Sequence, residues 1–270
     1  MDDKDREDRD GRGDIAKRAA PGVLTREVVL VLALSLGASG VSALLSFIGS
    51  VTAAKPLAKQ TAQLVTDLAP GRPWLGLAWQ LFAIATALVP VALVAHLLAR
   101  GGESLRGTLG FSLDDKRRDL GRGALVAAVI GGSGLALYLA ARAAGLNLTV
   151  VPTNLPDVWW RIPVLIAAAA QNAVLEETIV LGYLVHRLDQ LGWRPGRTVA
   201  AGALLRGSYH LYQGVGGFVG NAVMGVVFYA LYRRWGRVMP LVMAHTLIDA
   251  VAFVGSVLLA GHVGWLPANG

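Results

Sequence analysis

The 270-residue chain contains no cysteine and few charged residues. Without cysteine there is no disulfide, no thiolate metal ligand and no cysteine nucleophile. Only 16% of the residues are charged, whereas soluble domains average about 25%. The composition therefore argues against an ordinary soluble domain. Because 54% of the residues are hydrophobic, the expected solvent is a lipid bilayer.

The net charge of +7 at first suggests a nucleic-acid partner. The positions of the basic residues argue against this, because they gather at the ends of apolar runs, where they would meet lipid head groups. With the N-terminus in the cytosol, most of the 25 basic residues lie in the N-terminal tail or in inner loops. This distribution predicts a multi-pass protein of the cell membrane that contacts lipids and binds no nucleic acid.

The apolar runs predict an all-α fold, a polytopic bundle of transmembrane helices. A span needs about 20 apolar residues, and on this basis the chain has about seven spans, with six or eight left open. The glycine-rich residues 213–217 predict a tight helical hairpin, and residues 51–73 predict an amphipathic segment at the membrane interface. The expected spans lie near residues 27–50, 74–99, 122–145, 162–186, 197–213, 217–233 and 239–260.

Two domains are expected. Residues 1–25 are polar and mixed in charge, so they cannot bury enough apolar surface to fold and predict a disordered cytosolic tail. Residues 26–270 form the transmembrane domain, with an intramembrane site built by residues 160–255.

Glu176 and Glu177 interrupt the fourth apolar run, in which no other residue between Ile162 and His186 is charged at neutral pH. A carboxylate at the centre of a bilayer costs about 2.5–3.5 kcal/mol on insertion scales, so such residues mark functional sites. Adjacent residues lie about 100° apart around an α-helix. One glutamate is therefore expected to face the site, and the other to bond a neighbouring helix or a basic partner.

Two further polar pairs lie in the later runs. Arg206 and His210 are four residues apart, as are His245 and Asp249, so each pair shares one face of its helix. At about 1.5 Å per residue, the glutamates and both histidines lie in the membrane interior. Costly polar groups on three helices at compatible depths indicate a water-filled intramembrane site.

A carboxylate and imidazoles around a wet cavity suit hydrolysis. A buried glutamate can take a proton from water, and a histidine with an aspartate can stabilise a developing oxyanion. Alternatively, Glu176, His210 and His245 hold a zinc ion that keeps an open position for water. The sequence lacks the compact HExxH spacing of many zinc proteases, and the question of a metal stays open.

The three motifs, in this order, resemble the CPBP family of intramembrane proteases. The family comprises CAAX prenyl endopeptidase homologues and the bacteriocin-processing or self-immunity proteins also called Abi proteases. Its pattern is EExxxR, then FxxxH, then HxxxN or HxxxD. Here the corresponding segments are 176–181, 206–210 and 245–249, within a resemblance that covers roughly residues 160–255.

The resemblance implies a role for each polar residue. Glu176 would be the water-activating base and His210 its partner, while Glu177 would support the base. His245 and Asp249 would stabilise the oxyanion or complete a metal site. The implied substrate is a peptide or a lipid-anchored protein.

The chain departs from the family pattern at two positions. Leu181 stands where the family has arginine, and Arg206 stands where it has phenylalanine. We expect Arg206 to supply the displaced guanidinium, pairing with Glu177 or Glu176 across helices. Two other functions stay open: a proton-coupled transporter, and a non-catalytic immunity or binding protein on the same scaffold.

Overall fold

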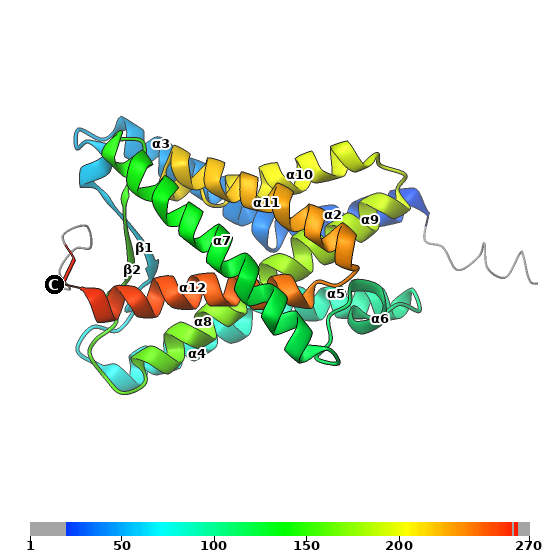
Figure 1. Cartoon of the computed structure of the whole chain (residues 1–270), viewed down its shortest axis with the longest axis horizontal. Helices are drawn as coiled ribbons and strands as arrows, with labels where there is room; N and C mark the ends of the chain where they lie inside the picture. Colours follow the sequence, from blue (N-terminus) through cyan, green and yellow to red (C-terminus); the bar gives the residue numbers. More distant parts are fainter. Residues whose placement is uncertain (1–19, 261, 264–270) are drawn as a thin grey trace, which may run out of the picture.

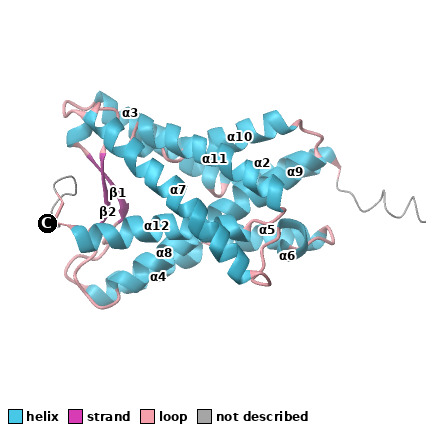
Figure 2. Cartoon of the chain, in the orientation of Figure 1, coloured by secondary structure: helices cyan, strands magenta, loops and turns pink. Residues whose placement is uncertain are grey.

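The computed structural model describes residues 20–260 and 262–263, and most of these residues are helical (Figure 1, Figure 2). The predicted all-α helical bundle is confirmed, with one small sheet added at its edge. The helices in the first half of the chain are α2 (Pro21–Ala33), α3 (Leu36–Thr52), η1 (Leu57–Lys59), α4 (Pro73–Ala87), α5 (Val89–Arg100), α6 (Leu105–Leu109) and α7 (Lys116–Ala143). Those in the second half are α8 (Arg161–Glu176), η2 (Glu177–Leu184), α9 (Val185–Gln190), α10 (Pro195–Ser208), η3 (Leu211–Gln213), α11 (Val215–Trp235) and α12 (Met239–Leu259).

Local sequence signals explain many of the helix ends. Proline lies in the first turn of α2, α4, α5, α10 and α12, where its missing N–H costs no helical hydrogen bond. The Ser104 side chain caps α6 by accepting a hydrogen bond from the Gly107 amide. Gly236 ends α11 with a φ of 66°, a left-handed conformation that glycine adopts readily.

Within the described residues, five helical segments are long and apolar enough to cross a membrane, by length and composition. The pair α2 and α3, bent by 47°, adds a sixth if it is counted as one span. These segments agree with a multi-pass membrane protein and with all the expected spans except 197–213. The five segments are Pro73–Arg100, Lys116–Ala143, Arg161–Gln190, Val215–Trp235 and Met239–Leu259.

The range 197–213 differs from the expected span because its helix ends early. α10 has 14 residues, which give a length of about 21 Å against a hydrocarbon core of about 30 Å. The His210 amide donates to the Gly207 carbonyl at 3.1 Å, and the chain then turns into η3. α10 and α11 pack against each other on either side of this turn, as the expected hairpin requires.

The N-terminal boundary also differs from the expected one. α2 begins at Pro21, inside the range 1–25 that was expected to form the tail. Residues 1–19 of that tail lie outside the described residues.

The sequence analysis missed a two-stranded parallel sheet. β1 (Thr61–Val65) pairs with β2 (Thr149–Thr153), and Thr61 lies opposite Thr149. β1 falls within the range 51–73, which was expected to be an amphipathic interfacial segment. The partner strands are far apart in sequence, so no hairpin turn signals their pairing. In Figure 1 the sheet lies at one end of the bundle, between the ends of the helices.

The centre of the bundle is η2, a π-helix whose eight residues are all buried. It continues α8 and packs against α5, α6 and α10. Gly182 permits the close approach of α6, because a Cβ there would lie 2.8 Å from Leu109 Cδ1. Segments with π-helical hydrogen bonding are rare and occur frequently at functional sites. η2 begins at Glu177, the second of the two intramembrane glutamates.

Candidate active site

Five parts of the fold bring the predicted polar residues together in one cluster: α8, η2, α10, the turn after α10 with His210, and α12 with His245 and Asp249. Glu176 ends α8 and Glu177 begins η2, while Arg206 lies in the last turn of α10. Neighbouring members of the cluster lie within 4 Å of each other. Its members are all six predicted site residues: Glu176, Glu177, Arg206, His210, His245 and Asp249.

The guanidinium of Arg206 lies at the centre of the cluster. Its Nη1 donates to Glu177 Oε2 at 3.1 Å, and its Nη2 donates to Glu177 Oε1 and, at 3.3 Å, to Glu176 Oε2. The ion pair expected across helices is therefore present, and it includes both glutamates. The spacing of 100° did not predict this arrangement, because two flexible carboxylates can converge on one large planar cation.

Beyond Arg206, each glutamate has its own partners. The Tyr209 hydroxyl donates to Glu176 Oε2 at 2.8 Å, and His210 Nε2 lies 3.8 Å from the same oxygen. Glu177 Oε1 is hydrogen-bonded to His245 Nδ1 at 2.7 Å. The pair is thus divided between two sides, one with Tyr209 and His210, the other with His245.

Burial distinguishes the two sides. Arg206 and Glu177 are 0% exposed, and His245 is 3% exposed. The side chains of His210 and Asp249 are 16% and 20% exposed. The cluster therefore has a closed ion-paired side and a more open side, with Glu176 in contact with both.

Two polar residues of the site were missed by the sequence analysis. Tyr209 donates to Glu176, and Asn172 Nδ2 donates to Asp249 Oδ2 at 3.5 Å. A signal for each was present, since Tyr209 precedes His210 and Asn172 lies four residues before Glu176, on the same helix face. Both are uncharged, and a search for ionisable residues passes over them.

Glu176, Glu177 and His245 have the composition of a metal site, and their ligand atoms lie within 4.8 Å of one another. This group contains Glu177 in place of His210, so it differs from the set proposed from sequence. Arg206 Nη2 lies among the three, 3.2 Å from His245 Nδ1 and in contact with both carboxylates. Zinc ligands lie about 2.0–2.2 Å from the ion. The residues as arranged surround a guanidinium and do not fit a zinc ion.

Residues 158–251 match a protein-family model described as Rce1-like, type II CAAX prenyl endopeptidase. This part of the chain is similar to that family. The matched segment covers roughly a third of the chain and contains all three motifs, so the resemblance to CAAX proteases is confirmed. Searches of curated proteins and of solved structures found no match.

The Rce1-like segment keeps a guanidinium beside its glutamates despite the two departures from the family pattern. Leu181 is 2% exposed within η2, whereas Arg206 reaches the same glutamates from α10. That Arg206 replaces the family's arginine in function is a prediction.

Proposed function

We propose that the protein is an intramembrane endopeptidase that hydrolyses a peptide bond with a water molecule activated by Glu176. The observation that carries the proposal is the position of Glu176 between the two sides of the cluster. Arg206 and Tyr209 donate hydrogen bonds to one of its oxygens, and His210, whose side chain is 16% exposed, lies 3.8 Å away. A fixed carboxylate beside a more accessible imidazole suits general-base catalysis.

In the proposed reaction, Glu176 takes a proton from water while the water oxygen attacks the carbonyl carbon of the scissile bond. Glu176 Oε2 and His210 Nε2 are too far apart for a direct hydrogen bond but close enough to share one water. The carbon–nitrogen bond then breaks, and Glu176 gives its proton to the leaving amine. The proton taken from water thus passes through Glu176 to the leaving amine, and the other proton stays on the new carboxyl group.

The histidines have separate roles in this proposal. His210 orients the attacking water, and its Nε2 is a buried atom with no hydrogen-bond partner among the described residues. His245 is fixed by Glu177 on one ring nitrogen, while its Nε2 lies 3.6 Å from Asp249 Oδ2. His245 with Asp249 would stabilise the tetrahedral oxyanion.

The match to a CAAX prenyl endopeptidase model supports a peptide substrate that is acted on in a membrane. The proposed substrate is a peptide or a lipid-anchored protein, and the proposed location is the cell membrane. The guanidinium of Arg206 already lies among the groups that would bind a metal. The proposed reaction therefore uses Glu176 as the base and needs no zinc ion.

The proposal is tested by comparing cell membranes that contain the wild-type protein with membranes that contain Glu176→Gln or His210→Ala. Labelling of new peptide N-termini should reveal products that only the wild-type protein generates. The purified protein should then cut a peptide that spans the identified site, and both variants should leave it intact.

Asp157→Asn is the matched control, because Asp157 pairs with Arg161 at the start of α8 and its side chain is 90% exposed. It should cleave like the wild type, and all variants should keep the wild-type circular dichroism. Normal cleavage by both site variants would contradict the proposal. Proton transport without cleavage would instead favour the transporter.

A further inference from the structure

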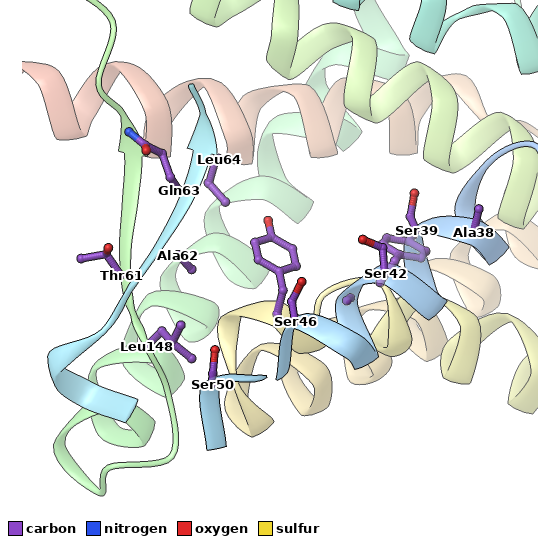
Figure 3. Close-up of a pocket in the computed structure, with 13 residues that line it drawn as sticks. Ala38, Ser39, Ser42, Ser46, Ser50, Thr61, Ala62, Gln63, Leu64 and Leu148 are labelled. Atoms are coloured by element: carbon purple, nitrogen blue, oxygen red, sulfur yellow. The ribbon is translucent and has the colours of Figure 1, made fainter. Parts of the chain in front are cut away.

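A groove of about 680 Å³ lies between α3 and β1 (Figure 3). Its volume is within the range of about 300–1,000 Å³ that is common for ligand sites. One wall is α3, whose Ser42 and Ser46 face the groove across from Ala62 and Leu64 of β1 in Figure 3. Both serines are exposed and four residues apart, so they present two hydroxyls on one helix face.

The opposite wall is the edge of β1. Four consecutive residues, 61–64, line the groove, whereas a groove over one face of a sheet is lined by every second residue. β2 pairs with only one edge of β1, and the sheet has no third strand among the described residues. The unpaired edge of β1 therefore faces the groove.

The register identifies a backbone group on this edge. Thr149 lies opposite Thr61, and the backbone amide of Thr149 donates to the Gln60 carbonyl at 2.9 Å. In a parallel pair, the amides and carbonyls of alternate residues point to opposite edges. The amide and carbonyl of Gln63 therefore point away from β2.

The groove also reaches the candidate active site. Tyr209 lines the groove, and its hydroxyl donates to Glu176 Oε2 at 2.8 Å. A chain that lies in the groove is thus separated from the proposed base by a single side chain. β1 has five residues, which span about 17 Å and match an extended segment of about five residues.

We infer that the groove binds the substrate as an extended polypeptide strand that adds to the free edge of β1. The added strand exchanges backbone hydrogen bonds with β1, and its other side faces the hydroxyls of α3. Such pairing satisfies the backbone N–H and C=O groups on the unpaired edge of β1. It also holds the peptide in the extended form that an attacking water needs. The inference rests on the proposed function for the identity of the occupant.

The absence of cysteine permits a test by disulfide crosslinking that does not depend on hydrolysis. Gln63→Cys would be made in the Glu176→Gln protein, since Gln63 is exposed on β1. The double variant would be incubated in detergent micelles with ten-residue peptides made of valine and threonine. Each peptide carries a single cysteine, at a different position. Leu68→Cys, 55% exposed in the native protein and outside the groove, is the matched control.

Strand addition predicts crosslinking that is at least tenfold above the Leu68→Cys control and that alternates with a period of two along the peptide. Alternation follows because successive side chains point to opposite faces of a sheet. N-methylation of the peptide amides that face β1 should lower the yield at least tenfold, and methylation of the intervening amides should not. Yields without alternation, or no higher than the control, would overturn the inference.

The crosslinking and cleavage experiments can fail separately. Alternating crosslinks without any cleavage by the wild-type protein would keep the strand-binding groove and remove the protease. Cleavage without alternating crosslinks would keep the proposed protease activity and overturn the strand-binding groove.

Discussion

Replacing Arg206 with leucine should be among the most destabilising single substitutions in the bundle. The side chain is 0% exposed and hydrogen-bonds both Glu176 and Glu177. Glu176 would keep the Tyr209 hydroxyl as a partner, whereas Glu177 would be a fully buried carboxylate held only by His245. Breaking a buried ion pair from one side costs about 3–5 kcal/mol, because the remaining charge has lost its compensation.

The assay is reversible unfolding in mixed detergent micelles titrated with SDS and followed by circular dichroism. Arg206→Leu should lower the free energy of unfolding by about 3–5 kcal/mol. Adding Glu177→Gln to Arg206→Leu should recover part of this loss, since it removes the uncompensated charge. A loss under about 1 kcal/mol, the range of an exposed ion pair, would refute the reasoning. So would the absence of any recovery in the double variant.

The same variant tests whether Arg206 replaces the family's arginine. Leu181 lies four residues after Glu177, in the wider turn of η2, so an arginine there can approach Glu177. Arg206→Leu should abolish cleavage, and adding Leu181→Arg should partly restore it. If the double variant is folded and still inactive, the two positions are not interchangeable.

Two further predictions concern the end of α10. Gly207→Ala should destabilise the protein by about 1–3 kcal/mol, because a Cβ there would lie 2.9 Å from the Phe218 carbonyl oxygen. Gly202→Ala on the same helix should be neutral or stabilising in the same unfolding assay, since its nearest contact is an ordinary 3.6 Å. Tyr209→Phe removes a hydrogen bond that fixes the position of the Glu176 carboxylate, and misplacing a catalytic group by about 1 Å can cost about 100-fold in rate, so kcat for the identified peptide should fall at least tenfold. An unchanged kcat would show that the hydroxyl does not support the base.

The charged part of the candidate site was predictable from sequence because charge is costly in an apolar run. Each of the six predicted residues stands out against its apolar surroundings, and the spacing of four residues placed Arg206 with His210 and His245 with Asp249. The neutral members Tyr209 and Asn172 cost less to bury and give a weaker signal. The convergence of both glutamates on Arg206 depends on side-chain length and on packing between helices, neither of which a sequence displays.

The fold was predictable in those segments that form helices, because a helix makes its backbone hydrogen bonds within itself. The long apolar runs gave helices near their expected positions, since hydrogen bonding within a helix is local. β1 and β2 each have five residues, and each forms its backbone hydrogen bonds with a strand that is far away in the sequence. α10 ends at Ser208 although hydrophobic residues continue beyond it, because the turn at Gly207 and His210 redirects the chain.

The π-helix η2 has a consequence for the phase of the long helical segment that contains it. A hydrogen bond from residue i to i+5 takes up more residues in each turn than an α-helix does. A single repeat of 3.6 residues therefore does not describe the faces of both α8 and α9. Asn172 and Glu176 follow the repeat of α8, whereas Arg187 follows the repeat of α9. Deleting one residue from η2 after Glu177 would change the phase of the later residues of this helical segment, moving Arg187 away from its partner Glu103 while leaving both glutamates in place.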